Sequence, residues 1–509
     1  MFVRKKRNQS GAISIQVIDK AKGFRVLKTI GCSNDPQEVE RFFQQGKAWI
    51  AQQEKQLPLF LADQKERAIV EAFVSQLTNS QVRTIGPELI FGTLFDEIGF
   101  GKIPDELFRH IVIARLAFPS SKLKTVDYLR RYQAVEMDVD KLYRFLDRLN
   151  ERHKEAIETV SYEHTKKLLG DSISIVFYDM TTLYFEAEDE DDLRKIGFSK
   201  DGKFQHPQIM LGLLVGKGGY PISYDIFEGN TFEGHTLLPV LERLKRRFGF
   251  SKVTVVADAA MLSKNNLTSL GEAHYQFIVG GRIKNESREL QKQILDQLPV
   301  LHQGIPLNLG RSDGTRLIVT WSEARSKKDA HNRDKGLTRI KKRIASGKLT
   351  KEHLNNRGYN KFLSLQGTVK VSIKEEKIEE DSQWDGLKGY LTNTDLKPET
   401  VTETYRELWQ IEKAFRISKT DLRIRPIFHF RKRRIEAHIC IAFSAYTVLK
   451  ELERRLSESG LPMSLKRASD LTHNMYSLNC LLPGNPLPQQ VLLNMDNEQK
   501  ALFDLICKR

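Results

Sequence analysis

Hydrophobic residues form short continuous runs between residues 171 and 284. The segment SISIVFYDMTTLYFE (172–186) is rich in β-branched and aromatic residues, and KVTVVADAAM (252–261) repeats that pattern. Between them, IMLGLLVGKGGYPISYDIF (209–227) has the pattern of two strands around a glycine-rich turn, and TLLPVLERLKRRF (236–248) has the spacing of an amphipathic helix. Continuous apolar runs are typical of strands buried on both faces, so the pattern predicts an α/β region with a central sheet.

The regions before and after this segment have different patterns of polar and apolar residues. Residues 1–60 alternate polar and apolar positions and then become charged, which predicts a small basic β hairpin followed by a helix. Residues 61–170 have helical spacing and predict a helical bundle. Residues 285–384 are strongly basic and hold strand-like segments around one basic helix, which either faces DNA or is simply solvated. Two more helices are expected, over 398–420 and 431–457.

These patterns divide the chain into six expected regions. They are a basic β and helical N-terminal region (1–60), a helical DNA-binding region (61–170), the first part of an α/β core (171–284), a β-rich basic insertion (285–384), the second part of the core (385–460) and a C-terminal tail that is a candidate for dimerisation (461–509).

Charge indicates the class of partner. The chain of 509 residues has 81 Lys and Arg against 65 Asp and Glu, a formal net charge of +16, so polyanions, and nucleic acid first among them, are the expected partners. Basic clusters such as Lys122 with Lys124, and Arg130 with Arg131, suit phosphate contacts, although a solvated helix face explains any single cluster equally well.

Cysteine usage and hydropathy bear on location. The four cysteines form no C-x-x-C pair, so a disulfide framework is excluded and a reducing, cytoplasmic location is expected. No stretch approaches the roughly 20 apolar residues of a membrane helix, so no membrane partner is expected.

Two aspartates close the apolar runs. Asp179 ends SIVFYD and Asp258 ends VTVVAD, so each carboxylate lies where a buried strand leaves the sheet. Strand ends are where sites form in α/β sheets, and an acidic side chain there costs stability unless it is paired or binds a metal. One such Asp is better explained as a cap or an ion pair, but two in one α/β region favour a functional site.

A third carboxylate lies on the helix expected over 398–420. At 3.6 residues per turn, Tyr405, Trp409, Glu412, Arg416 and Lys419 fall on one polar, aromatic and cationic face. A separate apolar stripe, formed by Leu408, Ile411 and Phe415, is expected to pack on the sheet. A solvated helix with salt bridges is the alternative, but aromatic groups stack on bases and cations contact phosphates, so this face also suits DNA.

Three carboxylates, Asp179, Asp258 and Glu412, suit phosphodiester cleavage. Two divalent ions roughly 3.5 to 4 Å apart can stabilise the attacking and leaving oxygens together, and oxygen ligands favour Mg²⁺ or Mn²⁺. Zinc is not expected because the sequence has no H-E-x-x-H pattern and no zinc spacing of cysteines, and no G-x-S-x-G motif supports serine hydrolase chemistry.

The motifs around these residues resemble a known family. The segment Y-D-M-T-T-L-Y-F-E around Asp179, the segment V-V-A-D-A-A-M-L-S around Asp258 and the helix from Tyr405 through Glu412 to Lys419 together resemble the DDE transposases of bacterial insertion sequences. The most similar group carries a Y-x2-R-x3-E-x6-K signature. Its Tyr, Glu and Lys match in place.

The resemblance covers roughly residues 171 to 460, including F-S-K-D-G-K (198–203) and E-G-N-T-F-E (228–233). It implies an RNase H-like catalytic core, interrupted by the insertion, with Asp179 on the first strand, Asp258 on the fourth and Glu412 on a late helix. The sequence departs from the signature at the Arg, which is Leu408 here. Arg406 and Arg416 are the candidates for its phosphate contact.

The function implied by the resemblance is transposition. Such an enzyme binds the terminal inverted repeats of its element as a homodimer on double-stranded DNA, cleaves at the element ends and joins the 3′ hydroxyl to target DNA. In this group the 3′ hydroxyl can first attack the opposite strand and form a hairpin, and the resemblance leaves open whether this chain does so. A base flipped out during hairpin formation suggests Trp321 as a stacking partner, although a core role on its own strand is the stronger reading. An RNase H-like nuclease that does not join ends and an inactive DNA-binding descendant are the alternatives, and a bacterial, nucleoid-associated location is implied.

Overall fold

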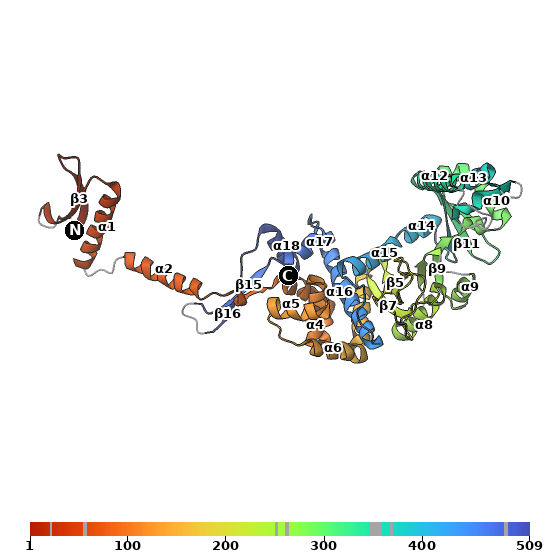
Figure 1. Ribbon diagram of the computed structural model, residues 1–509, viewed down its shortest axis with the longest axis horizontal. Helices are drawn as coiled ribbons and strands as arrows, with labels where there is room; N and C mark the ends of the chain where they lie inside the picture. The colour runs from red at the N-terminus through yellow and green to blue at the C-terminus, as the bar shows by residue number, and fades with distance from the viewer. Residues whose placement is uncertain are drawn as a thin grey trace. The chain divides into compact units, whose positions relative to one another are not determined.

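The computed structural model describes residues 1–20, 23–53, 59–249, 253–259, 264–346, 358–366, 370–482 and 487–508. It divides into two compact units, and Figure 1 labels many of their helices and strands. The smaller unit comprises Met1–Arg83 and Tyr476–Leu493, and the larger comprises Thr84–Met475 and Asn494–Arg509. No helix in the described part of the chain is both long and apolar enough to cross a lipid bilayer.

The smaller unit begins with an antiparallel sheet of three strands. Their order is β1 (Phe2–Arg7), β2 (Ile13–Asp19), β3 (Arg25–Ser33). The sheet has one strand more than the predicted hairpin, because the basic segment FVRKKR pairs with β2. The unit continues with α1 (Pro36–Gln53), α2 (Leu59–Ser75) and a second sheet of β4 (Val82–Thr84), β15 (Tyr476–Cys480) and β16 (Gln489–Leu492).

The larger unit contains a mixed sheet of eight strands. The strands that follow the predicted apolar runs are β5 (Ile175–Tyr184), β6 (Gln208–Gly216), β7 (Pro221–Glu228), β8 (Thr254–Ala257), β9 (Gln276–Gly281) and β14 (Leu387–Thr392), and β10 (Leu307–Gly310) and β11 (Arg316–Trp321) complete it. Their order is β10-β11-β14-β9-β8-β5-β6-β7. Strands β5, β8 and β9 are parallel, and all other neighbours are antiparallel. The predicted α/β class is therefore confirmed.

Helices cover both faces of this sheet. Alternate residues of β5 point to opposite faces, so Phe177 and Leu183 join one hydrophobic core while Val176 and Tyr178 join another. The first core includes residues of α14 (Pro398–Arg406), α15 (Trp409–Arg416) and α16 (Lys432–Ser459). The second includes residues of α8 (Leu237–Phe248) and α9 (Lys264–Glu272).

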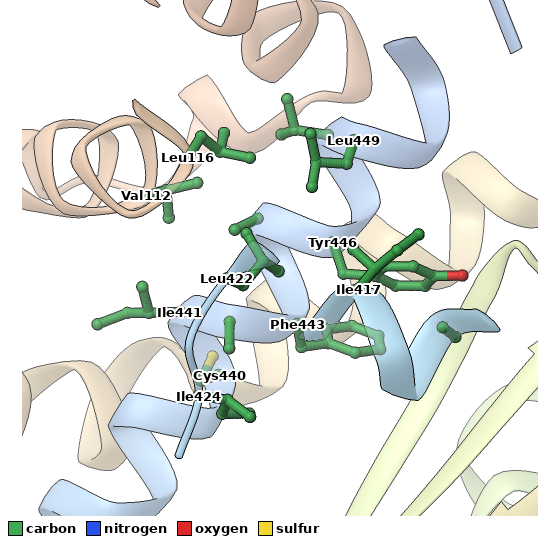
Figure 2. Close-up of a cluster of buried hydrophobic side chains, with 14 of the residues drawn as sticks. Val112, Leu116, Ile417, Leu422, Ile424, Cys440, Ile441, Phe443, Tyr446 and Leu449 are labelled. Carbon is green, nitrogen blue, oxygen red and sulfur yellow. The ribbon is translucent and has the colours of Figure 1, made fainter. Parts of the chain in front are cut away.

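A helical bundle surrounds α16, which is buried along most of its length. Its other members are the π-helix η2 (Glu88–Gly92), α3 (Thr93–Ile98), α4 (Glu106–Ala117), α5 (Lys122–Tyr128), α6 (Val139–Arg148), α7 (Lys154–Leu168), α17 (Leu465–Thr472) and α18 (Asn497–Cys507). Figure 2 shows Val112 and Leu116 of α4 facing Ile441 and Leu449 of α16. Because the same core includes Phe177 of β5, bundle and sheet are packed together.

The segment between β9 and β14 has helices as well as strands. Its elements outside the main sheet are α10 (Arg288–Asp296), α11 (Leu298–His302), α12 (Glu323–Ala345), β12 (Leu363–Gln366), β13 (Lys370–Ile373) and α13 (Glu375–Ser382). The basic helix expected in this segment corresponds to α12. Strands β10 and β11 extend the main sheet beyond β14 instead of forming a separate one.

Candidate active site

Asp179 of β5 and Asp258, which directly follows β8, are neighbours at two parallel strands. Tyr178 of β5 is the register partner of Ala257 of β8, and each aspartate is the next residue in its chain. Tyr178 and Ala257 both belong to the core on the α8 side, so alternation directs the two carboxylates to the other face, where α14 and α15 lie. The predicted strand end is confirmed for Asp258, which directly follows β8, but it is wrong for Asp179, which lies in the middle of β5 and is paired there with Leu213 of β6.

Asp179 is only 22% exposed, and its surroundings disfavour its charge. Burial raises the pKa of this carboxyl to about 6, and the negative charges of Glu233 and Asp258 act in the same direction. The Lys200 ammonium and the Met180 N–H, which donates to Asp179 Oδ1 at 2.7 Å, oppose that rise in pKa. A cation placed at this carboxylate would relieve the cost of its burial.

Lys200 supplies a positive charge at this point. Its Nζ lies 2.7 Å from Glu233 Oε1 and 3.8 Å from Asp179 Oδ1, and it donates to the carbonyl oxygen of Met180 at 2.7 Å. Neither Lys200 nor Glu233 was expected from the sequence to take part in the site. The only signal for them was that they belong to the segments F-S-K-D-G-K and E-G-N-T-F-E.

Asp258 is held by two donors. Its Oδ1 accepts a hydrogen bond from the Ala259 N–H at 2.6 Å and one from the Tyr405 hydroxyl at 3.4 Å. Tyr405 can approach because residue 280 is glycine: a Cβ atom there would lie 2.9 Å from the hydroxyl oxygen. Burial and the charge of Asp258 raise the pKa of Tyr405, so the phenol remains a donor. The rest of the motif, 260–263, lies outside the described residues.

The helix expected over 398–420 is interrupted, so the prediction of one continuous face is wrong. Helix α14 ends at Arg406 and α15 begins at Trp409. Between them the backbone tightens, since Leu408 N–H donates to the Tyr405 carbonyl and Ile411 N–H donates to the Leu408 carbonyl, both three residues back. This shift leaves Tyr405 buried against the sheet, whereas Glu412 is exposed.

The predicted apolar stripe of this helix is confirmed, because Leu408, Ile411 and Phe415 are all buried. Of its predicted DNA-binding residues, Arg406, Trp409 and Arg416 are exposed. Trp409 is 51% exposed, and the amine of Lys413 lies 5.5 Å from its ring centroid.

Lys419 lies apart from these exposed residues. The reason is that the helix is interrupted before Trp409 and continues after Arg416 as the π-helix η12 (Ile417–Asp421). Its Nζ lies 3.3 Å from Asp201 Oδ1, and the side chain is only 12% exposed. Asp201 also pairs with Arg425. In this arrangement Lys419 is part of a buried ion-pair network.

Lys388 of β14 connects Glu412 with Asp258. Its amine lies 4.5 Å from the centroid of the Tyr405 ring. Burial lowers the pKa of Lys388, as do Arg325 and Arg406, while Asp258 and Glu412 oppose that lowering. Both carboxylates are therefore within electrostatic range of the same ammonium group.

The described residues include no group of three or more His, Cys, Asp or Glu side chains placed to hold a metal ion. The adjacent carboxylates of Asp179 and Asp258 have oxygen donors suited to Mg²⁺ or Mn²⁺, and the desolvated Asp179 favours a nearby cation. Glu412 is linked to this pair through Lys388 and Tyr405, and its role as a ligand stays a prediction.

Trp321 lies at the end of β11, against the small core of the inserted segment. Its indole N–H donates to the carbonyl oxygen of Asp385 at 3.0 Å, and its ring centroid is 4.4 Å from that of His302. These contacts account for the residue structurally. Its stacking on a flipped base stays a prediction.

A cavity of about 750 Å³ adjoins Asp258 and Tyr405. It is bordered by Lys388 and by residues of α12, and it also contains the aromatic residue Trp384, which sequence reasoning missed. Most of its cations are already paired with acids; the pairs are Lys284 and Lys361 with Asp381, Arg325 with Asp329, and Arg333 with Asp385. Lys388 forms no such ion pair with a described residue, which leaves its charge directed at Asp258 and Glu412.

The chain is similar to known proteins in sequence and, over part of its length, in structure. Residues 170–448 match the model of a family described as the transposase DDE domain. Among solved structures, a Mos1 transposase paired-end complex with the left transposon end aligns at 13% identity and a TM-score of 0.16, covering 31% of this chain and 53% of that one. A pre-cleavage Mos1 transpososome aligns at 13% identity and a TM-score of 0.16, and the alignment covers 35% of this chain and 59% of that one. The alignments thus span little more than half of those chains, and no curated protein matches the sequence.

Proposed function

Because the chain belongs to the transposase DDE domain family, we propose that it is a DNA transposase that binds the terminal inverted repeats of an insertion sequence, cleaves at the element ends and joins the 3′ hydroxyl to target DNA. The observation that supports this proposal is the adjacent placement of Asp179 within β5 and Asp258 directly after β8. The net charge of +16 supports DNA as the partner.

Asp179, Asp258 and Glu412 are the proposed ligands of two Mg²⁺ or Mn²⁺ ions. Such ions, when bound, supply charge stabilisation to the attacking and leaving oxygens of a phosphoryl transfer. Acidic oxygen donors and the buried charge of Asp179 support this assignment. In the described arrangement Glu412 does not form a three-residue metal site with the two aspartates. For Glu412 to act as a ligand, α15 has to move so that its carboxylate comes closer to Asp179 and Asp258.

Other side chains of the site orient the reacting groups. The Tyr405 hydroxyl fixes the rotamer of Asp258, and Lys200 holds Asp179 and Glu233 together. Arg406 and Asp258 are both close enough to Lys388 to affect its pKa. Lys388 and Arg406 are therefore the proposed contacts of the phosphate that is cleaved. Trp409 and Arg416 offer an exposed aromatic and a cationic contact for the flanking DNA.

The strand order supports an RNase H-like core. Strands β7, β6, β5, β8 and β9 lie in that order, with β5, β8 and β9 parallel, and the inserted segment continues from β9. On this proposal the enzyme acts as a homodimer on two element ends, with a hairpin intermediate in which Trp321 stacks on a base. The proposed location is the bacterial cytoplasm, at the nucleoid.

Purified protein tests the proposal when it is incubated with Mg²⁺ and a duplex carrying the element's terminal repeat. We expect cleavage at the repeat and joining of the 3′ end to a second duplex. Asp179→Ala, Asp258→Ala and Glu412→Ala should each abolish both steps while DNA binding is retained. Asp192→Ala, in an exposed acidic loop, is the matched control and should remain active.

The products distinguish the alternatives. Cleavage without any joined product would support an RNase H-like nuclease instead. Binding without cleavage in the unaltered protein would support an inactive DNA-binding descendant. Full activity of any one Ala variant would remove that residue from the proposed ligand set.

A further inference from the structure

A second cavity in the larger unit, of about 380 Å³, has a basic lining. It lies between the end of α4, the start of α5 and the segment 423–430, and it shares no lining residue with the cavity beside Asp258. No described Asp or Glu lines it. Its principal basic residues are Arg115, Lys122, Arg423, Arg425, His429 and His438.

Four of these groups are buried together. Arg115, Lys122, His429 and His438 are each between 6% and 8% exposed. The ring centroids of the two histidines are 5.6 Å apart. Burial lowers the pKa of Lys122 well below its usual value, and the charge of Arg115 lowers it further. Burial also lowers the pKa of His429 to about 3 and that of His438 well below its usual value, so the two rings are neutral and the like charges that share this desolvated space are those of Arg115 and Lys122.

The hydrogen-bonding capacity of this cluster is largely unused. Arg115 donates to the Leu422 carbonyl at 3.4 Å, and the ammonium group of Lys122 forms no ion pair or hydrogen bond with any described residue. His438 uses Nε2 against the Ile424 carbonyl at 2.9 Å, but its Nδ1 has no partner. Buried cations without a counter-charge are costly, and a fold retains them where an anion compensates that cost.

We propose that this cavity binds a phosphate group. A phosphate has the charge and the several acceptor oxygens that Arg115 and Lys122 can satisfy together, and its negative charge would favour protonation of the unpartnered Nδ1 of His438, which could then donate as well. Two exposed apolar side chains, Leu123 and Phe428, line the same cavity, 68% and 63% exposed, and provide a surface for the sugar or base attached to a nucleotide phosphate. The phosphate belongs either to the DNA backbone or to a free phosphate compound, and the site does not depend on the carboxylates proposed for catalysis.

Lys122→Met tests the site, because methionine keeps the length of the side chain and removes its charge. In EDTA, sodium phosphate or a 5′-phosphorylated dinucleotide should raise the melting temperature of the unaltered protein by about 2 °C or more relative to sodium chloride of equal ionic strength. The variant should lose that response and should melt higher without phosphate, since the buried charge is gone. Lys141→Met, at an exposed position of α6, should respond like the unaltered protein.

DNA binding identifies the source of the phosphate. If the site binds a phosphate of the DNA backbone, Lys122→Met should reduce the slope of log K for DNA binding against log salt by about 1 for every DNA sequence. This result is expected whether or not free phosphate raises the melting temperature of the unaltered protein. If it takes a free compound, the slope should be unchanged while the thermal response is lost. His438→Gln should reproduce either pattern if Lys122→Met fails to fold.

A phosphate response retained by both variants, or the absence of both a phosphate response and a slope change, would overturn the proposal. Since EDTA is present throughout, an inactive carboxylate site would not alter these outcomes.

Discussion

The hydroxyl group of Tyr405 lies 3.4 Å from Oδ1 of Asp258, and a Cβ atom on Gly280 would lie 2.9 Å from the same hydroxyl oxygen. One residue of α14 and one of β9 therefore determine together how the carboxylate that follows β8 is held. The hydrogen bond fixes the carboxylate from the face on which α14 packs.

Tyr405→Phe removes this donor and leaves the ring in place. We expect a loss of about 0.5 to 1.5 kcal/mol in the free energy of unfolding and a fall in cleavage rate of roughly tenfold, because Asp258 loses one of its two restraints. Gly280→Ala should have a larger effect on both, since the new Cβ displaces the phenol. Urea unfolding and single-turnover cleavage measure the two quantities. Tyr132→Phe, at an exposed position, is the control, and a harmless Gly280→Ala would contradict the role given to Gly280.

Asp179→Asn should stabilise the metal-free protein above pH 6. Burial raises the pKa of Asp179 to about 6, above the usual value of 3.8, so the folded state binds more protons than the unfolded state between these two pH values. Stability of the unaltered protein should therefore fall as pH rises from about 4 to 6, and the Asn variant should lack this component. The expected gain at pH 7.5 is about 1 to 3 kcal/mol by urea unfolding in EDTA. Equal stability of the two proteins at that pH would show that Asp179 is not desolvated.

Lys200→Met should destabilise the site by removing the ammonium group between Asp179 and Glu233. The two carboxylates then repel each other, and we expect a loss of about 1 to 3 kcal/mol at pH 7.5, smaller below pH 5 where Asp179 is protonated. The double variant Lys200→Met, Glu233→Gln should recover part of the loss. Lys203→Met, in the same loop but exposed, provides the comparison. Additive losses in the double variant would mean that Lys200 and Glu233 do not act as a pair.

Asp201 is expected to matter more for stability than Lys419. Asp201→Ala leaves both Lys419 and Arg425 without their counter-charge, whereas Lys419→Met leaves the pair between Asp201 and Arg425 intact. We expect a loss of about 2 to 4 kcal/mol for Asp201→Ala and roughly half of that for Lys419→Met, measured by urea unfolding. A normal melting temperature but poor handling of cleaved ends in Lys419→Met would instead support a direct contact of Lys419 with DNA.

Trp321→Phe separates a structural role from a DNA role. Phenylalanine lacks the N–H that donates to the Asp385 carbonyl, so the inserted segment should lose about 1 kcal/mol of stability. The aromatic face is retained, so hairpin formation on a terminal-repeat duplex should persist with Phe and should be lost with Trp321→Ala if the ring stacks on a base. Unchanged hairpin formation in the Ala variant at a temperature where it is folded would end that assignment.

The strands of the main sheet could be predicted from the sequence because each prediction rests on a short stretch of neighbouring residues. The apolar run from 172 to 186 predicts β5, the turn at Lys217 predicts the hairpin of β6 and β7, and the ends of two such runs predict that Asp179 and Asp258 lie close together. These predictions depend only on side-chain type and short spacing, and the strands and the adjacency of the two aspartates are confirmed, although Asp179 lies within β5 and not at its end.

The remaining features depend on contacts between distant parts of the chain. The interruption between α14 and α15 has no Pro or Gly to mark it, and it arises where Tyr405 packs on Tyr390 of β14. Lys200 and Glu233 meet through two loops, which have no periodicity to reveal their positions. For the same reason, the joining of β10 and β11 to the main sheet could not be predicted from the alternation within those strands alone.

That joining gives the protein mechanical continuity. Backbone hydrogen bonds run without a break from β8, whose end carries Asp258, through β9 and β14 to β11, directly before the long basic helix α12. A nucleic acid strand bound to α12 would therefore keep a fixed position relative to Asp258. A force on that strand would be transmitted through the backbone hydrogen bonds of one sheet and not through a hinge.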